Sequence, residues 1–442
     1  MSSPLFAGDP AIATRWLSGS PTVLWIGDSI GAALQNRIFE GLRVTPAGLL
    51  VAGASLAGFS GLSFAAVGSG GQGASGLLSE SNYTPFASSE AVFNGTTVPS
   101  TGQPPAIDVR IFSDSNESFL IAGRTSYTFG QVDWLAGQSG LQLQAIMYRN
   151  SASSNGMVRN YVRGSSSTAT FKGFGSWLNL SASSPSYLKN TIPFTAPASG
   201  EYIYLESQTF EGAMPTAGSN VVICCAVVST GQPGFTLLPA NVSGWDILKW
   251  LNTSVISDNA LAGVLSLLGI TDIVISLGLS NPTNQDANQF QTSLQQLVTR
   301  LRTAVPTASI VFLPEYDANN PGSNNAPQLA GFTDAYYAVQ QTTANSCFLN
   351  LYQAGGPWSQ NQSLGFFSGG TTPTDAGAIY FVQVIGSLLQ QLIGGLTATA
   401  AGRYAVQGDI EDLFGTNNVA EWSSQSTSSS TFNVPRIQRA LN

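Results

Sequence analysis

The sequence places one serine where a nucleophile could act. Residues 23–26 are apolar, and Gly27, Asp28 and Ser29 follow them at once. A short apolar run that ends at a glycine is typical of a buried strand, and residues 31–39 are compatible with a helix. Ser29 is therefore expected at the carboxyl end of a strand in an α/β sheet, where such sheets usually bind ligands. A serine hydroxyl could attack an ester there, provided that a base removes its proton.

The usual base is missing from this chain. None of its 442 residues is a histidine, so the common serine–histidine pair cannot form. Glu315, Asp317 and Asp375 could be proposed instead, but a carboxylate with an ordinary pKa of about 4 is a poor base for a serine at neutral pH. Asp28 is expected to be structural and to hydrogen-bond the backbone around the turn.

The elements that must position Ser29 are of α/β type. Residues 271–278, 309–314 and 347–351 are predicted strands, of which the first is apolar on both faces as a central parallel strand requires. Helical patterns over 290–301 and 375–392 alternate with these strands. The alternation predicts a doubly wound parallel sheet.

Residues 82–240 have a different pattern. The runs 107–111, 141–148 and 201–206 alternate with period two between turns rich in Ser, Gly and Asn. This predicts an inserted antiparallel β-sandwich of jelly-roll type. Several of its aromatic residues could stack on sugar rings, although for any single one of them a place in the sandwich core is favoured. The candidates are Trp134, Tyr148 and Trp177, with Tyr161 and Tyr187 as further aromatic residues.

The tetrapeptide Gly27-Asp28-Ser29-Ile30 resembles the nucleophile block of the SGNH (GDSL-type) hydrolases, which are esterases, lipases and carbohydrate deacetylases. The resemblance covers residues 20–60 and 242–395. It implies a flavodoxin-like three-layer domain in which Ser29 is the nucleophile. In this family a glycine after the second strand donates its N–H to the oxyanion hole, and Gly58 is preferred to Gly53 for that position.

The later blocks depart from the family pattern. Residues 278–281 read Gly-Leu-Ser-Asn where relatives have Gly-x-Asn-Asp, so Ser280 stands at an oxyanion donor position. When the last block is aligned on its proline, Thr372 stands at the catalytic histidine and Gly369 at the catalytic aspartate. Thr374 is still suited to cap the helix that follows. The resemblance therefore implies a vestigial site with no catalytic residue expected.

Four segments are expected along the chain. Residues 1–81 and 241–398 form the two parts of the SGNH-like domain, residues 82–240 form the inserted β-sandwich, and residues 399–442 form a short tail module. In the tail, residues 414–422 contain a Phe-Gly-x-x-Asn-Val-x-x-Trp pattern that resembles short modules of bacteriophage structural proteins.

The composition argues against several classes of function. Charged residues are only 9 % of the chain and the net charge is −8, which argues against a nucleic-acid binder. The first residues lack the pattern of an export signal, and no uninterrupted apolar run is long enough to span a membrane. Three cysteines without zinc spacing predict neither disulfides nor a metal site, and no cofactor is expected.

These observations favour a non-enzymatic virion structural protein, such as a fibre, collar or capsid-decorating component. Its expected partners are other virion proteins, further copies of itself as a homo-oligomer, and cell-surface glycans. We expect it in the virion after synthesis in the host cytoplasm, or alternatively outside the cell or at its surface. The alternative function is a carbohydrate esterase or deacetylase that uses Ser29 with an atypical base.

Overall fold

The structure is a computed structural model, and it describes about three fifths of the chain. The described residues are 3–28, 31, 34, 59–65, 91–92, 107–110, 118–123, 139–149, 157–164, 171–184, 186–196, 203–209, 220–229, 235–241, 245–253, 258–279, 285–318, 326–367 and 370–394.

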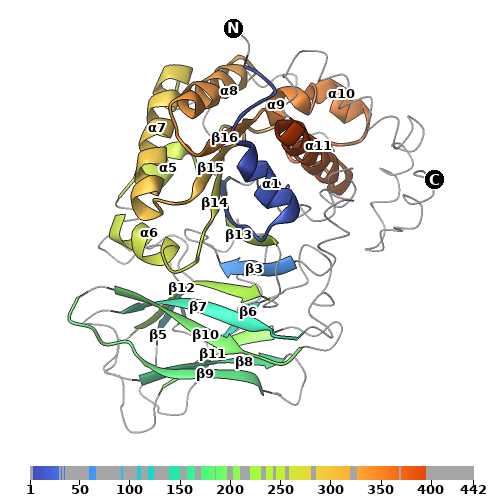
Figure 1. Ribbon diagram of the computed structural model, residues 1–442. Helices are drawn as coiled ribbons and strands as arrows, with labels where there is room; N and C mark the ends of the chain where they lie inside the picture. Colours follow the sequence, from blue (N-terminus) through green and yellow to red (C-terminus); the bar gives the residue numbers. More distant parts are fainter. Residues whose placement is uncertain are drawn as a thin grey trace, which may run out of the picture.

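Five parallel strands form the centre of the α/β part (Figure 1). Their order across the sheet is β16-β15-β14-β2-β13, and β1 pairs antiparallel with β16 at the edge. In chain order this is the 2-1-3-4-5 arrangement of flavodoxin-like folds. The bounds are β1 (Phe6–Gly8), β2 (Thr22–Gly27), β13 (Phe235–Asn241), β14 (Asp272–Ser276), β15 (Ser309–Phe312) and β16 (Ser346–Leu349).

Helices cover both faces of this sheet. Alternate residues of β2 contribute to two separate apolar cores, because successive side chains of a strand point to opposite faces. Val23 and Trp25 pack on one side with α1 and α11, whereas Leu24 and Ile26 pack on the other side with α5 to α8. The three-layer α/β arrangement is thus confirmed. The bounds are α1 (Pro10–Ser18), α5 (Ile247–Leu251), α6 (Asp258–Leu265), α7 (Ala287–Ala304), α8 (Ala326–Gln341), α9 (Leu351–Ala354), α10 (Trp358–Ser363) and α11 (Asp375–Gly394).

The two long helical predictions are confirmed. In α7 the five apolar residues of the predicted face, between positions 290 and 301, are all buried, and Asp286 closes a capping box with Gln289. α11 is more apolar than the sequence pattern indicated. Its stretch Ala376–Gly394 is long and apolar enough, by length and composition, to cross a membrane. Of its most apolar window, 78 % is buried inside the protein. We therefore interpret α11 as a core helix.

Antiparallel strands fill the middle of the chain. The large sheet continues from β13 through β3 and β12, and β7 and β10 extend it further. A separate four-stranded sheet has the order β6-β11-β8-β9. The bounds are β3 (Phe59–Ala65), β4 (Ala91–Val92), β5 (Ile107–Arg110), β6 (Ser118–Gly123), β7 (Gln142–Arg149), β8 (Met157–Gly164), β9 (Phe171–Asn179), β10 (Ser186–Pro193), β11 (Ile203–Thr209) and β12 (Asn220–Ser229).

The β-rich part is joined to the α/β part more closely than the sequence predicted. One of its sheets is continuous with the parallel sheet, and the expected boundary at residue 240 falls inside β13. Tyr187 of β10 also lies directly on α6, where a Cβ at Gly263 would be only 2.1 Å from its ring. Tyr187 therefore belongs to this contact, not to a sugar-binding surface. The division into domains stays a prediction.

Candidate functional site

The carboxyl ends of three neighbouring strands meet at one edge of the parallel sheet. Asp28 follows β2, Leu277 to Leu279 follow β14, and Glu315 lies three residues beyond β15. The order of strands reverses between β2 and β14 in this fold type, which opens the crevice where flavodoxin-like proteins bind ligands. Ser29 is the next residue after Asp28 and lies outside the described residues.

Asp28 and Glu315 form a buried carboxyl pair. Asp28 is 0 % and Glu315 4 % exposed. Burial raises the pKa of Glu315 well above its ordinary value, and the charge of Asp28 raises this pKa further. Two carboxylates can hydrogen-bond only when one carries a proton, and among the described residues no donor reaches Glu315 Oε1. Burial and the charge of Asp28 both favour the protonated form of Glu315.

The backbone after β14 fixes one side of this pair. The N–H of Leu279 donates to Glu315 Oε2 at 2.6 Å, which partly offsets the rise in the pKa of Glu315. Tyr336 of α8 holds the same loop, because its hydroxyl lies 2.8 Å from both the N–H and the carbonyl oxygen of Leu277. The segment that would carry an oxyanion donor in SGNH relatives therefore binds Glu315 through its backbone.

The segment aligned with the last family block lies above Tyr316, the neighbour of Glu315. The hydroxyl of Tyr316 donates to the carbonyl of Thr371 at 3.0 Å, and Trp358 Nε1 donates to the carbonyl of Gly370 at 3.3 Å. Thr372, at the family's histidine position, is exposed. This position offers a hydroxyl and no group that could take a proton from a serine.

The start of α11 keeps the form expected of this block. Thr374 Oγ1 accepts from the N–H of Gly377 at 3.2 Å, so Thr374 caps the helix as predicted. A Cβ on Gly377 would lie 2.3 Å from the carbonyl oxygen of Phe366, which requires a glycine at this close approach. The structural half of the block is thus in place.

Of the described carboxylates considered as a base, Glu315 lies at the sheet edge beside Asp28. Asp317 Oδ2 instead accepts from the backbone N–H of Trp358 at 3.1 Å, at the start of α10. The premise that each candidate has an ordinary pKa is wrong for Glu315. The sequence could not show this, because the shift arises from burial and from a partner nearly 290 positions away.

Several predicted site residues cannot be placed. Ser29, Gly53, Gly58, Ser280, Gly369 and Trp134 lie outside the described residues, as do the side chains of Tyr148, Tyr161 and Asp375. Trp177 is placed on β9, half-buried. Within the described ranges, no group of three or more His, Cys, Asp or Glu residues could hold a metal ion.

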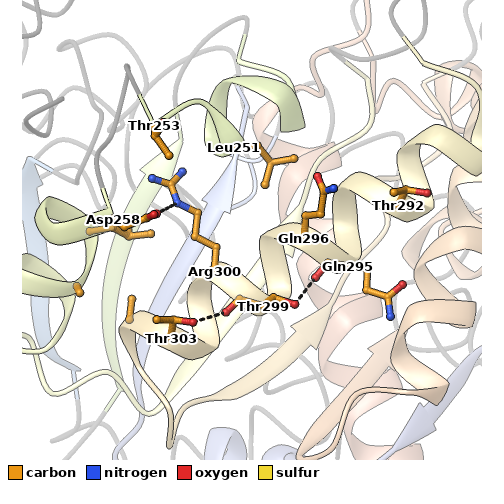
Figure 2. A pocket seen from close by; sticks show the side chains of 12 residues that line it. Leu251, Thr253, Asp258, Thr292, Gln295, Gln296, Thr299, Arg300 and Thr303 are labelled. Carbon is orange, nitrogen blue, oxygen red and sulfur yellow. Dashed lines mark hydrogen bonds and ion pairs between the residues drawn. The ribbon is translucent and has the colours of Figure 1, made fainter. Parts of the chain in front are cut away.

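A cavity lies on the outer side of α7 and has a volume of about 550 Å³ (Figure 2). Arg300 crosses it and pairs with Asp258 of α6 at 2.7 Å. Hydroxyls of Thr299 and Thr303 are turned back to helix carbonyls at 2.9 Å and 3.0 Å. None of the lining residues follows a strand of the parallel sheet, so this cavity is separate from the carboxyl pair.

Comparison of the chain with known proteins identifies its fold. No protein-family model matches the sequence, and no curated protein matches it. By structure, 31 solved chains are similar. A peptidoglycan O-acetylesterase has a TM-score of 0.55 at 12 % identity, over 89 % of this chain and 100 % of that chain. At this identity the similarity shows the fold alone.

Two further similar structures are a family 3 carbohydrate esterase from Talaromyces cellulolyticus and a family two carbohydrate esterase from Clostridium thermocellum. The first has a TM-score of 0.28 at 19 % identity over 36 % of this chain and 73 % of its own. The second has a TM-score of 0.28 at 12 % identity over 64 % of this chain and 94 % of its own. The fold of this chain is SGNH-hydrolase-like, with a mixed α/β sheet in which parallel strands dominate the centre.

Proposed function

We propose that this protein is a non-hydrolytic SGNH-like protein of a virion, with a scaffold role in the α/β part and a binding role in the β-rich part. The observation that carries the proposal is Thr372. An exposed threonine stands at the position of the family's histidine, in a chain that has no histidine. Without a base at that position, a serine at the end of β2 is a weak nucleophile.

The carboxyl pair supports the same conclusion. Glu315 can take a proton from a serine only when it is ionised, and burial and the charge of Asp28 favour its protonated form; its Oε2 also accepts from the N–H of Leu279. Other virion proteins, further copies of this chain and cell-surface glycans remain the proposed partners. The virion, or alternatively the cell surface or extracellular space, remains the proposed location.

We expect the purified protein not to hydrolyse 4-nitrophenyl acetate or butyrate above the rate in buffer. Ser29→Ala should leave that background unchanged, because a serine without a base contributes nothing to it. The assay compares initial rates of both proteins between pH 6 and 9. Turnover that disappears in Ser29→Ala would contradict the proposal.

A carbohydrate esterase is the second candidate, active only at a pH where Glu315 is ionised. Once ionised, a carboxylate with a raised pKa is a stronger general base than an ordinary one. If Glu315 activated Ser29, a fluorophosphonate probe should label the wild type above the pKa of Glu315. Labelling should be lost in both Ser29→Ala and Glu315→Gln, as measured by intact mass. The absence of labelling up to pH 9 would exclude this candidate.

A further inference from the structure

Arg159 of β8 and two aromatic residues of β9 form a cluster at the end of the molecule opposite the helices (Figure 1). The guanidinium carbon of Arg159 lies 4.3 Å from the ring centre of Phe174 and 5.9 Å from that of Trp177. Phe174 is 44 % exposed, which is unusual for so large an apolar side chain in this protein. Arg159 Nε donates to the carbonyl of Gly175 at 3.2 Å, which fixes the cation beside the rings. We call these three side chains the Arg159 platform.

The platform stands on a rigid base. A Cβ on Gly173 would lie 2.0 Å from the carbonyl oxygen of Pro193, and one on Gly175 would lie 2.8 Å from Asn190 Nδ2. The backbone of β9 therefore packs closely against β10, with no room for a side chain at either glycine. Because successive residues of a strand point to opposite sides, Phe174, between these glycines, points away from β10. A rigid aromatic surface loses little conformational entropy when a ligand binds.

The stretch of sequence that contains β8 and β9 has a charge opposite to that of the whole chain, although Glu206 of the neighbouring strand β11 lies in register with Tyr161 of β8. Between positions 134 and 200 there are five of the 16 Lys and Arg residues and no Asp or Glu, although the net charge is −8. Cross-strand register also places Arg159 opposite Trp177. The basic residues are Arg149, Arg159, Arg163, Lys172 and Lys189.

We propose that the Arg159 platform binds an acidic glycan, a polysaccharide whose sugar rings carry carboxylates. The aromatic rings would stack on the apolar face of a sugar, and the outer nitrogens of Arg159 would pair with a carboxylate. A neutral glycan would leave the guanidinium without an anion. Nucleic acid is disfavoured, because phosphate backbones are usually bound by many cations on a basic protein. The inference rests on the proposed binding role of the β-rich part, and it does not depend on whether Ser29 is catalytic.

Calorimetric titration of the full chain with polygalacturonate oligomers tests this proposal, with dextran oligomers as the neutral comparison. We expect binding of polygalacturonate that weakens with added NaCl, and none of dextran. Arg159→Gln and Trp177→Ala should each lower the affinity by about tenfold or more. Arg159→Lys, which keeps the charge but loses the planar fork, should give a smaller loss.

Two variants on the helical part are matched controls. Lys249→Gln removes an exposed cation of α5, and Ile393→Ala shortens an apolar side chain of α11 that is 44 % exposed. Both should bind like the wild type, and circular dichroism should show that all variants fold.

Four outcomes would overturn the inference. If both Arg159→Gln and Trp177→Ala still bind polygalacturonate like the wild type, the protein binds acidic glycans at a site other than the Arg159 platform. Equal binding of dextran, or of a single-stranded oligonucleotide, would show that the ligand class is wrong. No binding of any of the three would remove the glycan part of the proposed function as well.

Discussion

Replacing Glu315 by Gln should stabilise the protein at neutral and alkaline pH and leave its stability near pH 4 unchanged. The folded-state pKa of Glu315 is raised, so the folded protein binds this proton more tightly than the unfolded chain does. The stabilisation from this proton is fully present below the unfolded pKa of about 4.5. It is lost as the pH rises from there through the folded pKa, at about 1.4 kcal/mol per pH unit.

Glutamine is a close substitute for the protonated acid. Its carbonyl can accept from Leu279 N–H, and its amide can donate toward Asp28, as the protonated glutamic acid does. The difference in unfolding free energy between Glu315→Gln and wild type should therefore grow with pH from pH 4 to pH 8. Urea unfolding at pH 4, 6 and 8 measures it.

Asp258→Asn is the charge control, because it also removes one negative charge, from a side chain that is 67 % exposed; it gives up the ion pair with Arg300 as well, so only its change with pH is compared. It corrects for the change in net charge. A difference between Glu315→Gln and wild type that stays constant across these pH values would contradict the proton-sharing pair. If Glu315 were instead ionised at pH 8 without cost, the variant would be no more stable there than at pH 4.

The strands that form the sheet edge could be predicted from the sequence, but the buried carboxyl pair of Asp28 and Glu315 at that edge could not. Val23 to Ile26 indicated a buried strand because all four residues are apolar, and 271–278 did so because its centre, Ile273 to Ile275, is apolar on both faces; β2 and β14 are adjacent and parallel. Glu315 stood among three equivalent carboxylates in the sequence. Its distinguishing features are burial and the approach of Asp28 from another strand, and both are properties of the tertiary structure.

β13 was missed for an identifiable reason. Its sequence, Phe235–Asn241, contains Pro239, and a proline argues against a central strand because it has no N–H to donate. The structure tolerates it because the register with β3 runs only from Phe235 to Leu237, whereas the register with β2 runs from Thr236 to Asn241. Pro239 therefore lies beyond the part of β13 that pairs with β3, where its missing N–H leaves no hydrogen bond of that pair unmade. A period-two or apolar pattern cannot reveal where a neighbouring strand ends.

Arg15 should be the most sensitive polar residue at the opposite edge of the sheet. The short helix α1 places its guanidinium against Asp272, the first residue of β14, which is 0 % exposed. Arg15 Nε donates to Asp272 Oδ2 at 3.0 Å, and Nη2 donates to Asp272 Oδ1 and, at 2.7 Å, to Ser309 Oγ. This contact with Asp272 raises the pKa of Arg15. Asp272 also accepts from Thr271 Oγ1 at 2.7 Å, but that hydroxyl does not neutralise its charge.

Arg15→Leu should therefore lower the free energy of unfolding by about 3 kcal/mol, because it leaves a buried carboxylate without its cation. The partly exposed position of Arg15, 32 % by its side chain, sets this value at the lower end of the range for buried pairs. Adding Asp272→Asn to Arg15→Leu should recover part of the loss, since a neutral amide needs only hydrogen bonds. Urea unfolding of the two single variants and the double variant gives the coupling energy. If the two losses simply add, Asp272 does not depend on Arg15 for its charge balance, and α1 is held to the sheet by its apolar contacts alone.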